Sequence, residues 1–193
     1  MTTHKRIFLI RHGETEWTIK QKHTGLTDID LTQKGRDQAE HLHQRLLGKK
    51  FTKVLVSPLK RAQETCQIAG FFEHAEIYPD LLEWNYGDYE GKTTEEIHRT
   101  NPTWSIFLNG APGGESLQNI EQRTERVLKK IDRIDGNVIL FSSGHFLRAL
   151  TAKWLNLHVQ EGRLFVLSTA SISILGFERA QNAIIRWNDT GDF

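Results

Sequence analysis

Arg11 and His12 are the residues near the start of the chain whose types and spacing best suit chemistry. They follow the apolar run at residues 8–10 and precede Gly13. Such a run is typical of a strand covered on both faces, and the glycine allows a sharp turn. Ligands of open α/β sheets bind at the carboxyl ends of strands. A guanidinium beside an imidazole there indicates an anion site with a base or nucleophile in it, whereas the pair taken alone also fits a surface loop.

A second anion-compatible group follows a second predicted strand at residues 54–56. Ser57 and Pro58 come next and predict a helix start, with proline in the first helical position. Arg61 then falls in the first helical turn, where the helix N-terminus and the guanidinium both favour an anion. A structural salt bridge explains Arg61 equally well.

The same arrangement occurs a third time near the C-terminal end. Residues 138–141 predict a buried strand, and Ser143, Gly144 and His145 lead from it into a helix at residues 146–155. Three predicted strands therefore end in groups that are compatible with phosphate, and chance is a poor explanation for that repetition.

Two loops lie between these strands. Residues 17–30 form a polar loop that contains Thr24 and Gly25, and we expect it to lie across the site. Residues 81–91 are rich in aromatic residues and glycine, and they predict an ordered loop. Apolar neighbours of Glu83 in that loop would favour its protonated form, as a general acid requires. Taken alone, however, an N-terminal or hydrogen-bonded surface carboxylate is the favoured alternative. The surrounding segment, residues 83–116, is interpreted as a lid or insertion.

The remaining pattern predicts the elements that position these groups. Amphipathic helices are expected at residues 32–48, with Thr32 as N-cap, and at residues 116–134. Short helices broken at Pro102 are expected at residues 93–108. A weak strand is expected at residues 75–78, and a terminal hairpin is expected from residues 171–177 and 183–187. Strands that alternate with helices predict an α/β fold with a mostly parallel sheet covered on both faces.

Composition limits the classes of protein. The 193 residues, 38% of them hydrophobic, are expected to form one domain, 1–193. A net charge of +1, from 25 basic and 24 acidic residues, gives no basic field for nucleic acid or a membrane surface. Cys66 is the only cysteine, which excludes an intrachain disulfide and a thiolate zinc site. With no long apolar N-terminal segment, a cytoplasmic location is expected.

No cofactor and no metal are expected. The nine histidines are scattered along the chain, and His41 and His43 are too close in sequence to share one helix face. Neither a Walker-type phosphate loop nor a glycine-rich dinucleotide turn is present, so nucleotide hydrolysis and hydride transfer have no support.

Taken together, the motifs resemble the histidine phosphatase superfamily, also called the phosphoglycerate-mutase-like family, over essentially the whole chain. The motifs that occur in the family's order are Arg11-His12-Gly13-Glu14-Thr15 with Trp17, Thr24-Gly25, Ser57-Pro58 with Arg61-Ala62 and Thr65, Glu83 before Tyr86-Gly87 and Glu90-Gly91, Gly114-Glu115-Ser116, and Arg148-Ala149-Leu150. Residues 83–91 and 169–172 look most like the acid phosphatase and sugar-bisphosphatase branch.

This resemblance implies a three-layer α/β/α fold and metal-free phosphoryl transfer. His12 would attack phosphorus and become a phosphohistidine, Arg11 and Arg61 would hold the phosphoryl oxygens, and Glu83 would protonate the leaving oxygen and then activate water. The residues expected to bind the substrate phosphate are Arg11, Thr18, Thr24, Gly25, Arg61, Ser143, Gly144 and His145.

Two positions depart from the family pattern. Ser143 stands where the family has its second catalytic histidine, and His145 comes two residues later. Loss of one donor to the transition state costs about 3 to 4 kcal/mol, or on the order of 100- to 1000-fold in rate. His145 could reach inward as a substitute, although a helix N-terminus disfavours its charged form. Thr18 replaces an asparagine that is common in the mutases.

Three functions are therefore compared. The first is a phosphomonoester hydrolase acting on a small phosphorylated metabolite, such as a sugar phosphate or a phosphoglycerate. The second is a phosphate-binding module with little catalysis, which Ser143 favours. The third is a mutase, but residues 93–114 contain only Arg99 where the family's mutases have an adjacent arginine pair in a longer insertion. The substrate and the oligomeric state stay open, with a homodimer as one alternative.

Overall fold

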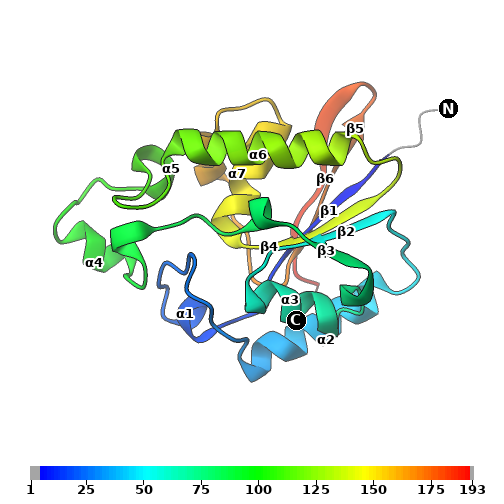
Figure 1. Cartoon of the computed structure of the whole chain (residues 1–193), viewed down its shortest axis with the longest axis horizontal. Helices are drawn as coiled ribbons and strands as arrows, with labels where there is room; N and C mark the ends of the chain where they lie inside the picture. The colour runs from blue at the N-terminus through cyan, green and yellow to red at the C-terminus, as the bar shows by residue number, and fades with distance from the viewer. Residues whose placement is uncertain (1–4, 192–193) are drawn as a thin grey trace.

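Six strands form one sheet in the order β3-β2-β4-β1-β5-β6 (Figure 1). The computed structural model describes residues 5–191. The strands are β1 (Ile7–Arg11), β2 (Lys53–Val56), β3 (Ala75–Ile77), β4 (Val138–Ser142), β5 (Ile172–Glu178) and β6 (Gln181–Asp189). The first four are parallel, and β5 and β6 add an antiparallel hairpin beside β1. The mostly parallel sheet and the terminal hairpin agree with the sequence predictions.

Successive residues of β1 supply two separate cores. Ile7 and Leu9 belong to one buried cluster, whereas Phe8 and Ile10 belong to another on the opposite face of the sheet. Side chains alternate between the faces of a strand, and both faces are covered here, so every position has to be apolar. The continuous apolar run before Arg11 therefore reflects a strand at the centre of the molecule.

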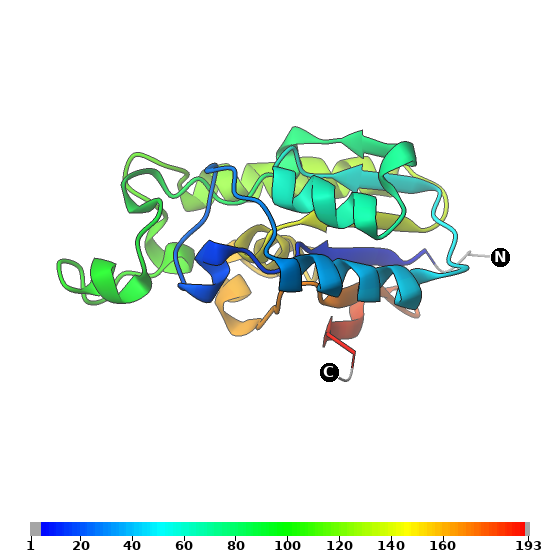
Figure 2. The same cartoon turned by 90° about the horizontal axis from the view of Figure 1, so that it is seen from below.

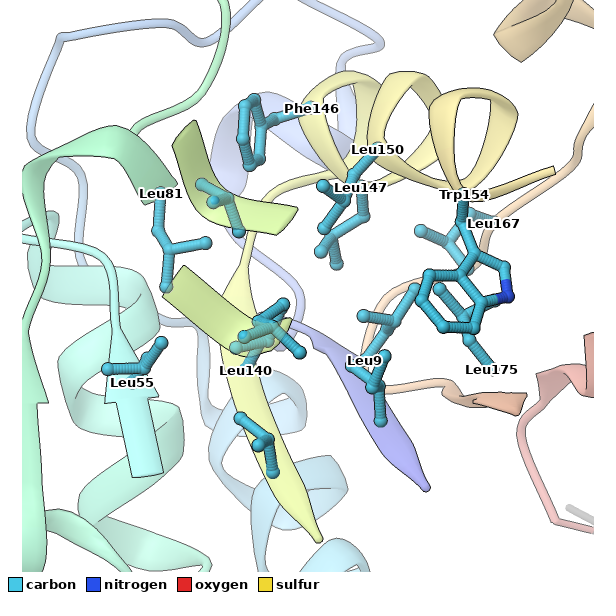
Figure 3. Packing of buried hydrophobic residues seen from close by; sticks show 14 residues of the cluster. Leu9, Leu55, Leu81, Leu140, Phe146, Leu147, Leu150, Trp154, Leu167 and Leu175 are labelled. Carbon is cyan, nitrogen blue, oxygen red and sulfur yellow. The ribbon is translucent and has the colours of Figure 1, made fainter. Parts of the chain in front are cut away.

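Helices cover both faces of the sheet, which gives the expected three-layer α/β/α arrangement (Figures 1 and 2). One layer contains α2 (Gln33–Leu46) and α3 (Lys60–Ile68), and the other contains α6 (Leu117–Asp132) and α7 (Gly144–Trp154). Figure 3 shows Leu147, Leu150 and Trp154 of α7 above the sheet residues of their cluster. This packing anchors α7, so its first residues are held in place at the end of β4.

The start of α3 differs from the prediction. Lys60 is the first helical residue, and Leu59 occupies the N-cap position without a side-chain cap. Ser57 still belongs to the carboxyl end of β2, because its N–H donates to the carbonyl oxygen of Phe141 in β4 at 2.9 Å. Residues 57–59 are therefore needed to cross from the sheet to the helical layer. Arg61 still lies in the first turn of the helix, as predicted.

The polar loop expected at residues 17–30 begins with a short helix, α1 (Glu16–Ile19). Thr15 and Thr18 form a reciprocal capping box, in which each side chain accepts a hydrogen bond from the other's backbone N–H. Two threonines at this spacing stabilise a single turn that has no hydrophobic periodicity to reveal it.

Residues 83–116 extend beyond the carboxyl ends of the parallel strands (Figure 2) and share a buried cluster with α6, α7 and η4 (Val159–Leu164). They contain η3 (Gly87–Tyr89), α4 (Thr94–His98) and α5 (Ile106–Asn109), and the other short helices of the fold are η1 (Phe72–His74), η2 (Pro79–Leu81) and η4. The aromatic residues Trp84, Tyr86 and Trp104 pack in one buried cluster with Phe107. Whether this segment moves as a lid stays a prediction. No described helix is long and apolar enough to cross a membrane.

Candidate active site

A cavity of about 480 Å³ lies where β1 and β4 end. The register of these strands pairs Arg11 with Ser142, so the segments that follow them begin side by side. The cavity is lined by predicted site residues, namely Arg11, His12, Thr18, Thr24, Glu83, Gly144 and His145, and by Gln21, Lys22, His23, Tyr86, Thr94, Arg148 and Leu167. Arg61, Gly25 and Ser143 do not line it. The fold therefore brings most of the predicted groups together.

His12 is held in one tautomer by two contacts. Its ring is only 3% exposed. Nδ1 lies 2.8 Å from the carbonyl oxygen of Gly13, and Nε2 lies 3.2 Å from Nε of Arg61. A carbonyl oxygen can only accept and a guanidinium can only donate, so Nδ1 carries the proton and Nε2 carries the lone pair. The nitrogen that lacks a proton thus faces the guanidinium.

Burial is the main reason why the pKa of His12 lies well below its usual 6.5. The positive charges of Arg61 and Arg11 lower that pKa further. Both effects disfavour the imidazolium, because burial removes hydration and like charges repel. His12 is therefore a neutral imidazole at physiological pH, which is the form that can act as a nucleophile.

Arg61 is fully buried and forms the centre of a hydrogen-bond network. Besides its bond to His12, it donates to the carbonyl oxygens of Thr27 at 3.0 Å, Thr24 at 3.0 Å and Gly25 at 2.8 Å. The same loop is held from its other side by Glu90, whose Oε1 accepts from the N–H groups of Gly25 and Thr27. Arg61 thus has a rigid position beside His12.

Glycine is needed at two positions around this network. A Cβ on Gly25 would lie 2.5 Å from Oε2 of Glu90, and one on Gly13 would lie 2.4 Å from the carbonyl oxygen of Gly35. Gly25 was predicted to bind phosphate, but its carbonyl oxygen binds Arg61 and its N–H binds Glu90. In this structure Gly25 positions the arginine and does not line the cavity.

Arg11 extends toward the start of α7. Its Nη1 donates to the carbonyl oxygen of Leu167, whereas its buried Nε has no hydrogen-bond partner among residues 5–191. The guanidinium is so close to Gly144 that a Cβ on that glycine would lie 3.2 Å from Nε. Arg11 therefore brings a fixed positive charge to the cavity wall with part of its hydrogen-bonding capacity unused.

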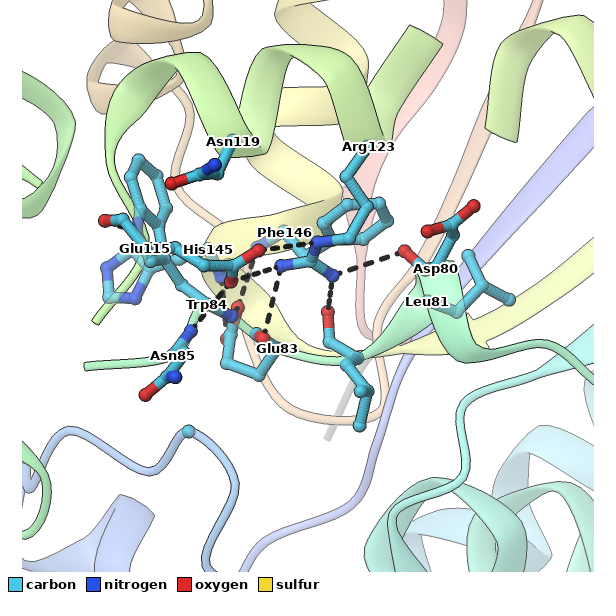
Figure 4. Close-up of polar contacts among 12 residues, drawn as sticks. Asp80, Leu81, Glu83, Trp84, Asn85, Glu115, Asn119, Arg123, His145 and Phe146 are labelled. Atoms are coloured by element: carbon cyan, nitrogen blue, oxygen red, sulfur yellow. Dashed lines mark hydrogen bonds and ion pairs between the residues drawn. The ribbon is translucent and has the colours of Figure 1, made fainter. Parts of the chain in front are cut away.

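Glu83 is 4% exposed and its carboxylate is bound by three backbone N–H groups. Oε1 accepts from Trp84 and Phe146, each at 2.8 Å, and Oε2 accepts from His145 at 2.9 Å (Figure 4). Of the two alternatives that the sequence left open, apolar surroundings and a hydrogen-bonded carboxylate, the structure shows the hydrogen-bonded one, although the side chain is buried and not on the surface. The physical reason is that the first turn of α7 has N–H groups without helical partners, and Glu83 satisfies two of them.

Sequence reasoning missed Arg123, which fixes the segment that carries Glu83. Its guanidinium donates to the carbonyl oxygens of Asp80, Leu82 and Glu83 and pairs with the carboxylate of Glu115 (Figure 4). Arg123 comes three residues after Ile120 and four before Val127, on the buried stripe of α6. A charged residue at such a position was the signal that could have revealed it.

The start of α7 contains Ser143 and His145, where the sequence departs from the family pattern. Ser143 is 1% exposed, and its Oγ has no hydrogen-bond partner in the described chain, not even as a helix cap. The ring of His145 is partly buried, and its Nδ1 is hydrogen-bonded to the hydroxyl of Tyr86. Burial, followed by the charge of Arg148, holds the pKa of His145 well below its usual value. His145 is thus uncharged, as expected, with burial as the main cause.

Thr18 and Thr24 line the cavity, but their hydroxyls are engaged locally. The hydroxyl of Thr18 donates to the carbonyl oxygen of Thr15 at 2.8 Å, and that of Thr24 donates to the carbonyl oxygen of Lys22 at 3.1 Å. Within residues 5–191, no three His, Cys, Asp or Glu side chains lie so that they could hold a metal ion. The charged side chains that line the cavity are those of Arg11, Lys22, Glu83 and Arg148.

The sequence model of the histidine phosphatase superfamily (branch 1) matches residues 7–190. The chain belongs to this superfamily. An acid phosphatase of Mycobacterium tuberculosis is 40% identical over 178 residues, which cover 90% of this chain and 87% of that protein. A sedoheptulose 1,7-bisphosphatase of Saccharomyces cerevisiae is 31% identical over 188 residues, with 81% and 69% of the two chains covered.

The fold of this histidine phosphatase agrees with that of solved relatives. The structure of the product of open reading frame Rv3214 from Mycobacterium tuberculosis superposes with a TM-score of 0.93 at 36% identity, covering 97% of this chain and 99% of the other. Because the named relatives are phosphatases, an enzymatic role is supported for this histidine phosphatase.

Proposed function

We propose that the chain is a metal-independent phosphomonoester hydrolase in which Nε2 of His12 attacks phosphorus. The observation that carries this proposal is the fixed tautomer of His12, whose unprotonated Nε2 is next to Arg61 in a buried setting. A nucleophile needs a free lone pair, and a developing phosphoryl charge needs fixed cations nearby. The contacts of His12 keep Nε2 unprotonated and place a cation beside it, and the Arg61 N–H that bonds to this lone pair has to be displaced when Nε2 attacks phosphorus.

The reaction has two steps. In the first, the lone pair of Nε2 forms the N–P bond, the P–O bond to the leaving group breaks, and Glu83 gives a proton to the leaving oxygen. In the second, Glu83 takes a proton from water as the water oxygen attacks the phosphohistidine and the N–P bond breaks. Arg11 and Arg61 stabilise the charge that spreads over the equatorial oxygens in each transition state. The proton that Glu83 loses in the first step is regained in the second.

The proposed substrate is a small phosphorylated metabolite with hydroxyl groups, such as a sugar phosphate. A cavity of about 480 Å³ lies within the usual size range of small-molecule sites. Besides the groups proposed to hold the phosphate, the cavity is lined by polar side chains that can hydrogen-bond to hydroxyls, including those of Gln21, His23 and Thr94. The names of the two curated relatives, an acid phosphatase and a sugar bisphosphatase, favour the same class. We keep the cytoplasm as the proposed location.

Turnover of a substrate panel tests this proposal. Sugar phosphates, phosphoglycerates and p-nitrophenyl phosphate are assayed with the wild type, His12→Ala and the control His43→Ala. His43 is a partly buried histidine outside the cavity that contacts the carbonyl oxygen of Ala69. We expect His12→Ala to abolish turnover and His43→Ala to keep it. Alkaline quenching of the wild type during turnover of ³²P-labelled substrate is expected to trap an acid-labile phosphohistidine at residue 12. Equal turnover by wild type and His12→Ala would overturn the proposal.

The unpartnered Oγ of Ser143 favours a second candidate function, a phosphate-binding module with little catalysis. Such a module would bind inorganic phosphate in a calorimetric titration and would lose that binding in an Arg11→Met variant. It would turn over none of the substrates in the panel. Measurable turnover that depends on His12 would exclude this alternative.

A further inference from the structure

The hydroxyl of Tyr86 is hydrogen-bonded to Nδ1 of His145, a contact whose direction depends on the tautomer of the ring. In the part of the chain that the structure describes, the hydroxyl has no other acceptor, so the arrangement that satisfies it has the hydroxyl as the donor. Burial raises the pKa of Tyr86 well above its usual value, so the phenol keeps its proton. A neutral imidazole has one donor nitrogen and one acceptor nitrogen. Since Nδ1 accepts from Tyr86, the proton of His145 is on Nε2.

The Nε2–H group of His145 opens into the cavity. The residue lines the cavity, and no described residue is hydrogen-bonded to its Nε2. Among residues 5–191, the enclosed side-chain atoms without a hydrogen-bond partner belong to Arg6, Arg11, Glu90 and Ser143. Nε2 of His145 also has no partner but is not one of these atoms, so it is not enclosed. Nε2 is therefore in contact with the cavity space, where a bound molecule can reach it.

The ring of His145 is fixed in this orientation by its neighbours. Its centroid lies 5.3 Å from that of Phe107 and 5.9 Å from that of His23. Its backbone N–H donates to Oε2 of Glu83, and the charge of Arg11 is close enough to lower its pKa. His145 thus lines the same cavity as Glu83 and Arg11, two groups that the proposed reaction uses.

The space beside His145 has two unused polar atoms. Oγ of Ser143 and Nε of Arg11 are both enclosed and unpartnered within residues 5–191. A buried donor or acceptor without a partner costs about 1 to 3 kcal/mol, and such groups are retained where a ligand satisfies them. Ser143 does not line the cavity, so of these two residues only Arg11 adjoins a molecule bound there.

We infer that His145 donates a hydrogen bond from Nε2 to the phosphoryl group of the substrate, and that Tyr86 is the positioning residue that keeps its proton on that nitrogen. This inference rests on the proposed function. His145 then serves as a neutral donor on the side where Ser143 supplies no cation. A purely structural role, in which the ring only fills space between Phe107 and His23, is the alternative that the experiments have to exclude.

The first experiment observes the ring nitrogens directly. Long-range ¹H–¹⁵N NMR spectra of the wild type at pH 7 are expected to show His145 with a protonated Nε2 and an unprotonated Nδ1. Titration with inorganic phosphate is expected to shift the Nε2 signal of His145, whereas the nitrogens of His43 stay unchanged. The Tyr86→Phe variant should show a mixture of both tautomers. A single unchanged signal for His145 at saturating phosphate would overturn the inference.

The second experiment separates a hydrogen-bond donor from a space-filling ring. His145→Phe keeps an aromatic ring and removes the N–H, so kcat/KM with p-nitrophenyl phosphate should fall by on the order of 100-fold, mainly through kcat. His145→Gln keeps an amide N–H and should recover part of that loss. Tyr86→Phe should lower kcat in proportion to the fraction of His145 that loses its proton from Nε2. Circular dichroism and the unfolding midpoint identify variants that have lost their fold.

The outcomes distinguish this inference from the proposed function. If His145→Phe has wild-type turnover while His12→Ala is inactive, the reaction stands and the role of His145 is wrong. If His145→Gln is as poor as His145→Phe although both are folded, a hydrogen-bond donor is not what the site needs. Turnover that persists in His12→Ala would instead contradict the proposed function itself.

Discussion

Two sides of the cavity differ in how completely their polar groups are paired. On the side formed by β1 and α3, His12, Arg61 and the loop at residues 24–27 are joined by hydrogen bonds. Thr65 extends this network by accepting from the N–H of Gly13 and donating to the carbonyl oxygen of Arg61. One atom on this side, Oε2 of Glu90, is enclosed without a partner among residues 5–191. On the side where α7 begins, two such atoms, Oγ of Ser143 and Nε of Arg11, are enclosed without partners, whereas the carboxylate of Glu83 is paired with three N–H groups.

The difference separates groups that are held in place by hydrogen bonds within the fold from groups that have no partner in the described chain. The nucleophile and its guanidinium need no substrate to hold their geometry, so their arrangement contributes to stability as well as to the proposed chemistry. The α7 side carries more of the unpaired polar atoms, which lower stability unless a bound group satisfies them. We therefore expect substitutions on the first side to affect both activity and stability, and those on the second to affect mainly activity.

Arg61→Lys is expected to have the largest effect. A lysine has a single charged nitrogen and cannot satisfy three carbonyl oxygens together with Nε2 of His12. We expect kcat/KM to fall by on the order of 1000-fold and the unfolding midpoint in urea to decrease. The matched control is Arg36→Lys, since Arg36 is a partly exposed arginine paired with Glu64. Similar losses in both variants would contradict the special role of the Arg61 network.

Ser143→His is expected to have the next largest effect on turnover, and it tests the α7 side. A histidine at this position would return a donor to the phosphoryl group, so we expect turnover to rise by up to about 100-fold. Ser143→Ala controls for loss of the hydroxyl alone. The loss caused by His145→Phe should become smaller in the Ser143→His background, because two donors would then share one role. Unchanged turnover in a folded Ser143→His variant would show that the α7 side lacks no donor.

Much of the first side could be predicted because its signals are local in sequence. The apolar run before Arg11 has to be a doubly covered strand, and the parallel arrangement brings the ends of β1, β2 and β4 to one edge. Arg61 reaches His12 because it lies in the first turn of the helix that follows β2. The helix starts two residues later than predicted, and Arg61 is still in its first turn.

The second side depends on contacts between distant parts of the chain, which no local pattern encodes. Tyr86 and His145 are 59 residues apart and meet only because the aromatic cluster of residues 83–116 packs against α7. The carboxylate of Glu83 binds N–H groups that are 62 and 63 residues away. Ser143 could be identified as a departure from sequence alone, but its unpaired hydroxyl required the packed structure.

Acid conditions should lower the free energy of unfolding through His12 on the first side and His145 on the second. The pKa values of His12 and His145 are lowered in the folded state, so the unfolded chain takes up protons near pH 6.5 while the folded chain does not. Their stabilising contribution is thus complete above pH 6.5 and is lost as the pH falls. For each of these histidines the loss is at most about 1.4 kcal/mol per pH unit.

Urea unfolding at pH 7.5, 6.5, 5.5 and 5.0 checks this dependence. His12→Phe and His145→Phe should each reduce the slope of unfolding free energy against pH. Because His12 stays neutral below pH 6.5, the proposed activity should persist at mildly acidic pH for as long as the chain stays folded. A slope in His12→Phe equal to that of the wild type would contradict the assignment to His12.

The smallest effects come from removing one hydroxyl on each side. Thr65→Val keeps the shape of the side chain but leaves the N–H of Gly13 without its acceptor, which should lower the unfolding free energy by about 1 to 3 kcal/mol. Ser143→Ala removes a hydroxyl that has no partner in the described chain, so the change should be within about 0.5 kcal/mol or slightly stabilising. Urea unfolding of both variants measures this contrast. If Ser143→Ala instead destabilises the fold as much as Thr65→Val, the Ser143 hydroxyl has a partner in the folded protein, and the two sides of the cavity are equally paired.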